Sequence, residues 1–270
     1  MSRLWPKIAA FFQHWRSSST VACDRVYAVG DVHGRFDLFR HLLNQLEADA
    51  FSQATRPSRI ILLGDLIDRG PQSSQMLEFA RAMQRQNRGR VVVLCGNHED
   101  MLLASADGNA DAQRLWLANG GDATLQSYGL DLSAFVRLSP EERGWALRDA
   151  VGLETLRWLR ALPSAYRLGD YFFCHAGVRP GIALDEQRRQ DLLWIRQEFL
   201  HSPDFHGAII VHGHSERHEV EVRPNRINVD TSAYRSGELT AVGLQGPYRW
   251  FISTSRKYLN RSELDAHLRM

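Results

Sequence analysis

Short apolar runs recur along the chain from about residue 25, and a turn that contains glycine or histidine follows most of them. Short apolar or β-branched runs bounded by such turns are typical of buried strands. The runs that we interpret as strands are residues 26–29, 59–63, 91–94, 171–174, 208–211, 227–229 and 239–244.

Between the early runs, apolar residues recur at the spacing of a helix face. The first set is Phe36, Phe39, Leu43 and Leu46, and the second is Met76, Phe79, Ala80 and Met83. Strand and helix therefore alternate through the first hundred residues, which predicts βαβ units in an α/β fold whose helices cover a sheet.

Residues 101–165 interrupt this alternation. They hold leucines at helical spacing (153, 156, 159 and 162), scattered tryptophans and an Asn119-Gly120-Gly121 turn, but no clear strand pattern. We expect a helical insertion that covers one edge of the sheet and shapes a substrate groove. The strand pattern resumes at Tyr166 and predicts meandering hairpins.

Composition limits the class of protein. The chain has 270 residues with 33 Lys+Arg against 31 Asp+Glu, so its net charge of +2 predicts neither a nucleic-acid binder nor an acidic tail. Three cysteines in this length exclude a disulfide scaffold and favour a reducing, cytoplasmic location. No apolar run approaches the roughly 18 residues of a membrane-spanning helix.

Both ends differ from the middle. Residues 1–22 form a basic, aromatic arm, which we interpret as a frayed terminus; a weak contact of residues 1–20 with a membrane surface or partner is the alternative. We expect the catalytic domain over residues 23–250. Residues 251–270 would then form a C-terminal tail, part of a basic, solvated segment that starts at Arg249.

Five of the predicted strands are followed by side chains that can bind a metal. They are Asp31 and His33; Asp65 and Asp68; Asn97, His98 and Glu99; His175; and His212 with His214. Parallel strands bring their carboxyl ends to one edge of a sheet, where α/β proteins place their sites. Oxygen and imidazole donors without cysteine exclude an iron–sulfur or zinc–thiolate centre, and several carboxylates suit two divalent ions that share one bridging aspartate.

These blocks resemble a known family. Asp31-x-His33, Gly64-Asp65-x-x-Asp68-Arg69-Gly70 and Gly96-Asn97-His98-Glu99, followed by two separate histidines, are similar to the metallophosphoesterases of the phosphoprotein phosphatase family, and most of all to bacterial and phage lambda-type Ser/Thr phosphatases. The resemblance implies a calcineurin-like metallophosphoesterase fold, in which two mixed β-sheets are sandwiched by helices.

The same resemblance implies a role for each residue. Asp31 and His33 would hold the first metal, Asp65 would bridge, and Asn97, His175 and His214 would hold the second. His98 would be the general acid, with Asp68 as its hydrogen-bond acceptor, while Arg69 and Arg196 would grip the phosphate. The cofactors would be two divalent ions, foremost Mn²⁺ with Fe²⁺ or Zn²⁺ as alternatives, and a hydroxide between them would attack in line.

Other residues near these blocks receive structural interpretations. His212 is expected to be a strand residue or a hydrogen-bonding neighbour of the site rather than a ligand. Asp230 is either a support for the site or a turn residue. We expect Glu99 to make structural hydrogen bonds, and Cys95 and Cys174 to be buried apolar thiols.

The first functional hypothesis is a phosphomonoesterase that acts on phosphoserine or phosphothreonine proteins or on small phosphate esters. The alternative on the same fold is hydrolysis of dinucleoside polyphosphates or removal of nucleotide caps. The symmetrical branch of these hydrolases differs from this chain by Ala at the position of Asp68 and by a GNHD block. An inactive scaffold would have lost His98, Asp68 or Arg69, and all three are present. Glu216, at a position where metallophosphodiesterases carry a histidine, disfavours that class.

Overall fold

The strand that carries the first motif lies in the middle of a mixed sheet. The computed structural model describes residues 25–51 and 58–255. The predicted arm 1–22, Cys23 and residues 256–270 of the predicted tail lie outside the described residues. β1 (Arg25–Val29) pairs in parallel with β2 (Ser58–Leu62), and β2 pairs in parallel with β3 (Val91–Val93). On its other side β1 pairs antiparallel with β9 (Thr240–Gln245), which pairs with β10 (Tyr248–Ser253).

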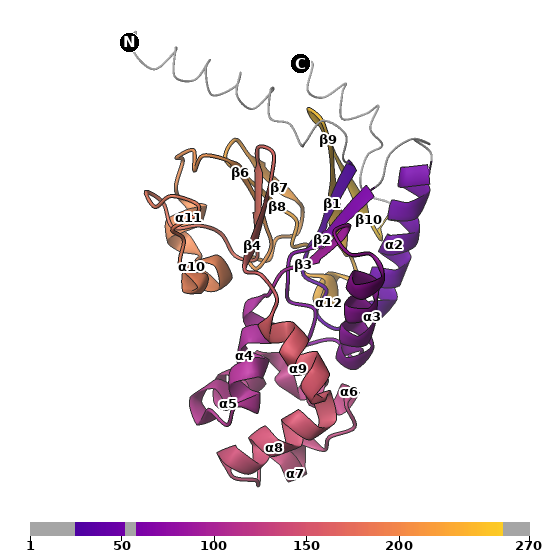
Figure 1. Cartoon of the computed structure of the whole chain (residues 1–270), viewed down its shortest axis with the longest axis vertical. Coiled ribbons are helices and arrows are strands. Elements are labelled where there is room, and N and C mark those ends of the chain that lie inside the picture. The colour runs from indigo at the N-terminus through magenta and orange to yellow at the C-terminus, as the bar shows by residue number, and fades with distance from the viewer. Residues whose placement is uncertain (1–24, 52–57, 256–270) are drawn as a thin grey trace.

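A second mixed sheet packs against the first. Its strand order is β4 (Ala165–Leu168), β5 (Tyr171–Cys174), β6 (Ile209–His212), β8 (Arg226–Asn228) and β7 (Glu221–Arg223). β5, β6 and β8 run parallel, whereas the outer strands β4 and β7 are antiparallel to their neighbours. The carboxyl ends of β1, β2 and β3 and those of β5 and β6 face the same end of the molecule (Figure 1).

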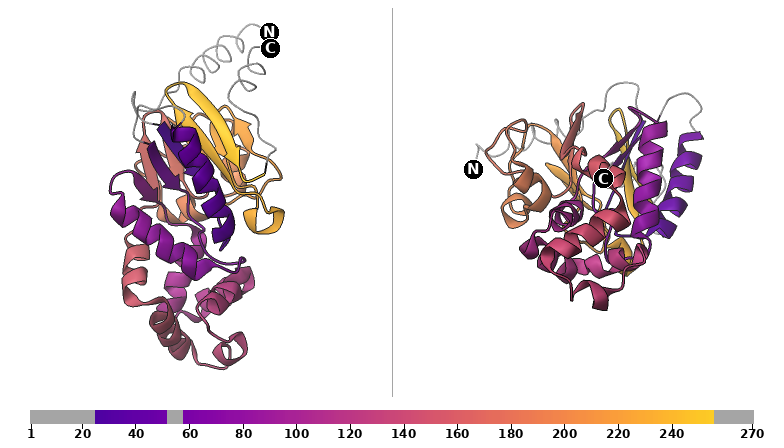
Figure 2. Two further views of the ribbon diagram at one scale, coloured as in Figure 1. Left: turned by 90° about the vertical axis from the view of Figure 1, so that its right-hand side faces the viewer. Right: turned by 60° about the horizontal axis from the view of Figure 1, so that its bottom comes forward.

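Alternating side chains divide the core into layers. From β1, Tyr27 and Val29 pack toward α2 (Phe36–Phe51) and α3 (Ser73–Gln86), while Val26 and Ala28 pack between the two sheets. A third cluster joins the outer face of the second sheet to α10 (Arg189–Trp194) and α11 (Gln197–Leu200). The order is therefore helix, sheet, sheet, helix (Figures 1 and 2), and the expected α/β sandwich is confirmed.

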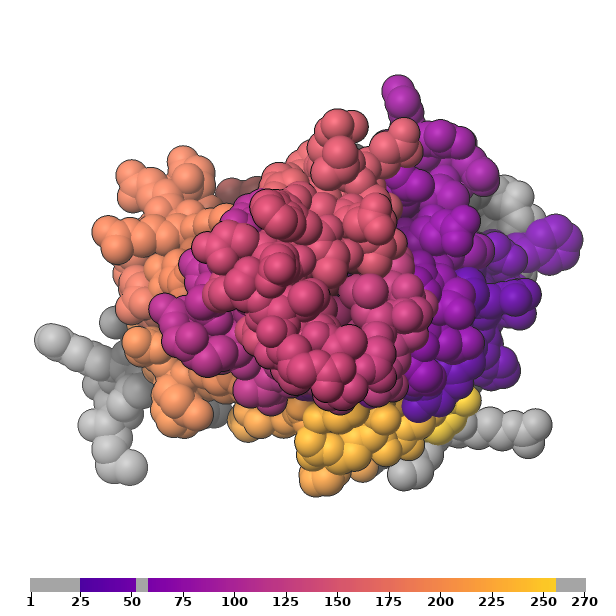
Figure 3. Space-filling view, turned by 90° about the horizontal axis from the view of Figure 1, so that it is seen from below, coloured from indigo at the N-terminus to yellow at the C-terminus, as the bar shows by residue number. Residues whose placement is uncertain are grey.

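The helical insertion lies beyond the carboxyl ends of the strands. Its elements are α4 (Asn97–Ala106), α5 (Ala110–Trp116), the π-helical turn η1 (Leu117–Gly121), α6 (Asp122–Ser127), α7 (Leu132–Phe135), α8 (Pro140–Val151) and α9 (Leu153–Arg160). Leu156 and Leu159 join the same core cluster as α2 and α3, so the insertion continues the main core. Seen from below, it occupies the centre of that face (Figure 3). Within the described residues, no helix is long and apolar enough to cross a membrane.

The expectation that a solvated segment begins at Arg249 is wrong for its first residues. Arg249 lies inside β10, which follows β9 through a tight turn, and Trp250 of this strand is only 3% exposed. Its indole packs over Gly243, where any Cβ would come within 2.1 Å of the ring. Arg249 and the basic residues that follow it in the sequence suggested a solvated segment, although Trp250, Phe251 and Ile252 form an apolar run of the kind that predicts a strand. β7 is a further strand that the apolar pattern did not predict, since its residues are mostly polar.

We expect Trp250→Ala to lower the free energy of unfolding by about 3–5 kcal/mol, because it empties a packed position beside Tyr27 and Gly243. Urea unfolding followed by circular dichroism measures the change. Tyr248→Ala, in the same strand but 48% exposed, is the matched control and should cost less than about 1 kcal/mol. Equal effects of the two substitutions would contradict the placement of Trp250 in the core.

Candidate metal centre

Two clusters of potential ligand atoms lie at the carboxyl ends of the strands. In one cluster the ligand atoms of His33, Asp65 and His98 all lie within 4.8 Å of one another, and in the other those of Asp65, His175 and His214 do. All of these side chains are buried. Asp65 belongs to both clusters, which is the position that a carboxylate shared by two cations would take.

The two remaining expected ligands lie beside these clusters. Asn97 is the first residue of α4, and its Oδ1 is 2.8 Å from Nε2 of His175. Oδ2 of Asp31 accepts a hydrogen bond from the backbone N–H of His214 at 3.0 Å. The structure therefore brings all six expected ligands together from the ends of β1, β2, β3, β5 and β6, although the first and last of them are 183 positions apart in the sequence.

Backbone carbonyls orient two of the histidines. Nδ1 of His33 lies 2.8 Å from the carbonyl oxygen of Ile67, and Nδ1 of His175 lies 3.0 Å from that of Leu63. Each carbonyl accepts the Nδ1 proton, which leaves Nε2 directed into the cluster. Such partners fix the tautomer and the ring orientation of metal-binding histidines.

The electrostatics of the clusters indicates a shortage of positive charge. Burial and the nearby carboxylate of Asp230 hold the pKa of Asp31 well above its usual value. Burial alone would lower the pKa of His175, but the carboxylates of Asp65 and Asp31 outweigh it and raise the pKa to about 9. Protons are thus favoured on both groups, and a cation that replaced them would satisfy the same negative potential.

The residues present fit a pair of divalent cations. Oδ1 of Asp31 and Nε2 of His214 are buried and have no hydrogen-bond partner among the described residues, as expected of atoms that bind an ion. The donors are carboxylate, amide and imidazole groups, which suit Mn²⁺, Fe²⁺ or Zn²⁺. Gly213 leaves room for this arrangement, because a Cβ there would lie 2.0 Å from Oδ1 of Asp31.

The backbone around the clusters is strained. The described non-glycine residues with positive φ are His33, Asp65, Asp68, Arg69, His214 and Ser232. All but Ser232 are expected site residues. Positive φ is unfavourable for side chains with a Cβ and persists only where the surroundings enforce it, which is typical of functional sites.

The expected general acid has the expected partner. Nδ1 of His98 lies 2.6 Å from Oδ2 of Asp68, and both side chains are buried. Burial would lower the pKa of His98, but the carboxylates of Asp65 and Asp68 outweigh it, so the pKa is raised and the imidazolium is favoured. Nε2 of His98 is 3.7 Å from Oδ2 of Asp65, so the proton that it carries faces the clusters.

The insertion supplies contacts to this pair that sequence reasoning missed. Nε1 of Trp116 and Oγ1 of Thr124 donate to the Asp68 carboxylate at 2.9 and 2.6 Å. Gly120, in the Asn-Gly-Gly turn, accepts a hydrogen bond from the backbone of Arg69 at 3.0 Å, and a Cβ at Gly120 would lie 2.7 Å from Cγ of Arg69. The turn was visible in the sequence, but its contact with Arg69 was not.

Arg69 reaches the clusters, whereas Arg196 lies at their margin. Nη1 of Arg69 is 3.0 Å from Nε2 of His33 and donates to Oε1 of Glu216 at 2.9 Å. Glu216, which sequence reasoning treated only as a missing histidine, also accepts hydrogen bonds from Ser232 and Tyr234. Arg196 is exposed. Its charge still acts on the clusters: the burial of His214 lowers the pKa of that histidine, and the charges of His175 and Arg196 lower it further, to about 2.

The remaining residues singled out from the sequence lie around the site. His212 ends β6 with its ring against Phe199, outside both clusters, and burial lowers its pKa to about 3. Oδ1 of Asp230 accepts from the backbone of Ser232, as a turn residue would, while its other oxygen is buried without a partner among the described residues. Glu99 accepts hydrogen bonds from the backbones of Asp65, Leu66 and Gly96, so its expected structural role is confirmed. Cys95 and Cys174 are buried free thiols.

Two mixed sheets between helices, with buried aspartates and histidines gathered at the strand ends, define an α/β metallohydrolase. Residues 24–245 match the calcineurin-like phosphoesterase family, and the chain belongs to that family.

Relatives of known name fall into two groups. A symmetrical bis(5'-nucleosyl)-tetraphosphatase of Aromatoleum aromaticum is 32% identical over 163 residues, which cover 60% of this chain and 48% of that protein. Serine/threonine-protein phosphatase 1 of Salmonella typhimurium is 29% identical over 229 residues, which cover 82% of this chain and 92% of that protein. The chain spans about half the length of the first of these relatives. A solved structure of a serine/threonine phosphatase from Saccharomyces cerevisiae shares the fold, with a TM-score of 0.57 and 16% identity. The superposition covers 94% of this chain and 91% of that one.

We expect Asp65→Asn to remove most of the bound metal, because the amide lacks the charge that two cations would share. Metal analysis after dialysis against Mn²⁺ should show close to two ions per unaltered chain and fewer than one per variant. Asp185→Asn, at an exposed position, is the control and should bind metal normally. Full metal content in the Asp65 variant would contradict the assignment.

Proposed function

We propose that the chain hydrolyses a phosphate bond with His98 as the general acid and Arg69 as the phosphate-binding residue. The observation that carries this proposal is the 2.6 Å contact between His98 and Asp68, buried beside Asp65. A protonated imidazole held by a carboxylate can deliver its proton to the leaving oxygen, a contribution on the order of 10²–10⁴-fold in rate. Arg69 would hold two phosphate oxygens with its planar guanidinium.

The cluster residues would hold the metals of this reaction. His33 and Asp31 would bind one divalent ion, Asn97, His175 and His214 the other, and Asp65 both. Two such ions, with Mn²⁺ as the first candidate, would supply positive charge for the phosphate oxygens and lower the pKa of a bound water toward neutrality. Glu216 would keep Arg69 beside His33 and His98 while the phosphate is held.

For the substrate, we place a dinucleoside polyphosphate first. The tetraphosphatase from Aromatoleum aromaticum and a second from Nitrosospira multiformis, each 32% identical, carry that activity in their names. They favour the alternative hypothesis over the phosphoprotein substrate that was expected first. A phosphate leaving group is a weaker base than an alkoxide, so it needs less assistance from His98.

A phosphorylated protein is the second candidate, and two observations favour it. The phosphatase from Salmonella typhimurium matches over 92% of its own length. Within this chain, Asp68 is held by three donors and supports His98, as the departure of a poorly leaving serine or threonine oxygen requires.

We expect His98→Asn to lower kcat by about 10²–10⁴-fold on a phosphate ester of an aliphatic alcohol, and by much less on 4-nitrophenyl phosphate, whose leaving group needs no proton. Metal content should be unchanged. His41→Asn, on the exposed face of α2, is the control. If the variant instead lost metal, His98 would be a ligand of the His33–Asp65 cluster rather than an acid.

Rates on diadenosine tetraphosphate, a phosphothreonine peptide and a phosphotyrosine peptide should separate the two candidates. We expect kcat/KM for diadenosine tetraphosphate to exceed that for either peptide by at least about tenfold, with product analysis showing cleavage of the polyphosphate chain. A higher kcat/KM on the phosphothreonine peptide would move the second candidate to first place.

A further inference from the structure

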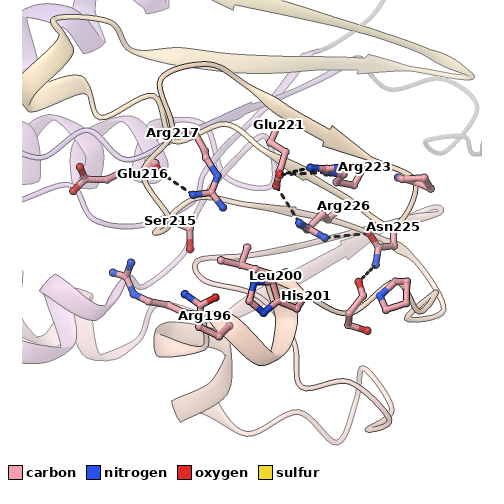
Figure 4. A pocket seen from close by; sticks show the side chains of 14 residues that line it. Arg196, Leu200, His201, Ser215, Glu216, Arg217, Glu221, Arg223, Asn225 and Arg226 are labelled. Atoms are coloured by element: carbon pink, nitrogen blue, oxygen red, sulfur yellow. Dashed lines mark hydrogen bonds and ion pairs between the residues drawn. The ribbon is translucent and has the colours of Figure 1, made fainter.

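A large cavity opens beside the metal centre, on the side of the second sheet. Its volume is about 1400 Å³, and it lies between the end of α11 and the segment from β6 to β8 (Figure 4). Ser215 and Glu216 line it and follow His214 directly, so the cavity adjoins the expected ligand cluster. The mechanism proposed above does not use the other residues that line it.

Arginines dominate the charged lining of this cavity. They are Arg196, Arg217, Arg223 and Arg226, against two carboxylates, Glu216 and Glu221. Arg69 and Arg235, which lie outside the lining, already pair with Glu216. Glu221 is shared by Arg223 at 3.2 Å and Arg226 at 3.1 Å. The cavity therefore keeps an excess of positive charge that its own carboxylates do not neutralise.

Two buried groups in the lining have unused hydrogen-bonding capacity. Arg226 is 5% exposed, and its Nε has no hydrogen-bond partner among the described residues; Ser215 is 3% exposed, and the same is true of its Oγ. Figure 4 shows the Ser215 hydroxyl and the Arg217 guanidinium directed toward the space above Leu200 and His201. Buried donors without partners are costly, and a bound anion would satisfy them.

Arg226 is held in place among like charges. Asn225 anchors the preceding position, since its amide donates to the backbone carbonyls of Ser202 and Asp204 at 2.9 and 2.8 Å. The Arg226 guanidinium lies 5.7 Å from the centre of the Phe199 ring. Burial lowers the pKa of Arg226. The carboxylate of Glu221 opposes this shift, whereas the charges of Arg223 and Arg217 lower the pKa further. Crowded arginines of this kind favour a multiply charged anion.

We propose that this cavity binds a second phosphate group of the substrate, one that is not hydrolysed. The inference rests on the proposed function, because it assigns the bond that breaks to the metal centre and the rest of the phosphate chain to Arg217 and Arg226. A guanidinium can bind a phosphate through two parallel hydrogen bonds. A ligand with several phosphate groups can therefore engage several arginines at once, whereas a ligand with a single carboxylate cannot.

The test compares Arg217→Gln with the unaltered chain, both loaded with Mn²⁺. We expect KM for diadenosine tetraphosphate to rise about 10–100-fold with little change in kcat, as for the loss of a hydrogen bond to a charged group. KM for 4-nitrophenyl phosphate, which has one phosphate, should stay within about twofold because it does not reach the cavity. Arg137→Gln, an exposed arginine of the insertion, is the matched control and should leave both values unchanged.

A second measurement separates this inference from the choice of substrate. ADP and AMP are compared as inhibitors of 4-nitrophenyl phosphate hydrolysis, with Mn²⁺ in excess so that chelation does not deplete the centre. The unaltered chain should bind ADP at least about tenfold more tightly than AMP, and Arg217→Gln should abolish that preference. If this holds while diadenosine tetraphosphate is not hydrolysed, the proposed substrate fails and the second-phosphate site stands.

Three results would overturn the inference. One is equal inhibition by ADP and AMP in the unaltered chain. Another is a variant that changes KM for both substrates alike, which would place Arg217 at the metal centre. The third is an unchanged preference for ADP in Arg217→Gln together with weaker binding of an acidic phosphopeptide, which would assign the cavity to a protein substrate.

Discussion

Buried negative charge at the strand ends is the constraint on which the rest of the site depends. The carboxylates brought together there are Asp31, Asp65, Asp68, Glu99 and Asp230, each at most 2% exposed. An unpaired buried charge costs several kcal/mol, so each must be satisfied. Backbone N–H groups satisfy Glu99, and the insertion satisfies Asp68. Asp31 and Asp230 each retain an oxygen without a partner among the described residues. Bound cations are the groups best able to neutralise the negative charge of these carboxylates.

Much of this could be predicted from sequence because each expected ligand lies within four residues of the end of its own strand. Each apolar run predicts a strand, and the polar residue that follows it marks the carboxyl end of that strand. The edge of the sheet that carries the site could therefore be inferred without knowing how the strands pair. Contacts between distant segments could not. Thr124 and Trp116 meet Asp68 across 56 and 48 positions, and Glu216 meets Arg69 across 147. Strand β10 was missed for a different reason, since Arg249 and the basic residues that follow it in the sequence suggested a solvated tail.

The metal centre alone does not determine the substrate. A phosphate monoester and a phosphate anhydride present the same transferring group, so both need positive charge on its oxygens and a nucleophile available at neutral pH. They differ in the group that leaves, and therefore in how much protonation it requires and in what must be held beyond the reacting phosphorus. On the proposed function, the protonation of the leaving group would depend on the His98–Asp68 pair, and the binding of the rest of the substrate would depend on the arginine-lined cavity.

One short loop links these two regions. His214 belongs to the ligand cluster, Glu216 holds Arg69, and Arg217 lines the cavity, all within four consecutive residues. The loop is itself constrained, because His214 has positive φ, Gly213 packs against Asp31, and the Asn228 side chain donates to the carbonyl of Ser215 at 2.7 Å. A displacement of this loop would move the expected ligand His214, the partner of Arg69 and the cavity wall together. On the function proposed above, substrate recognition and catalysis would therefore be coupled through the same backbone.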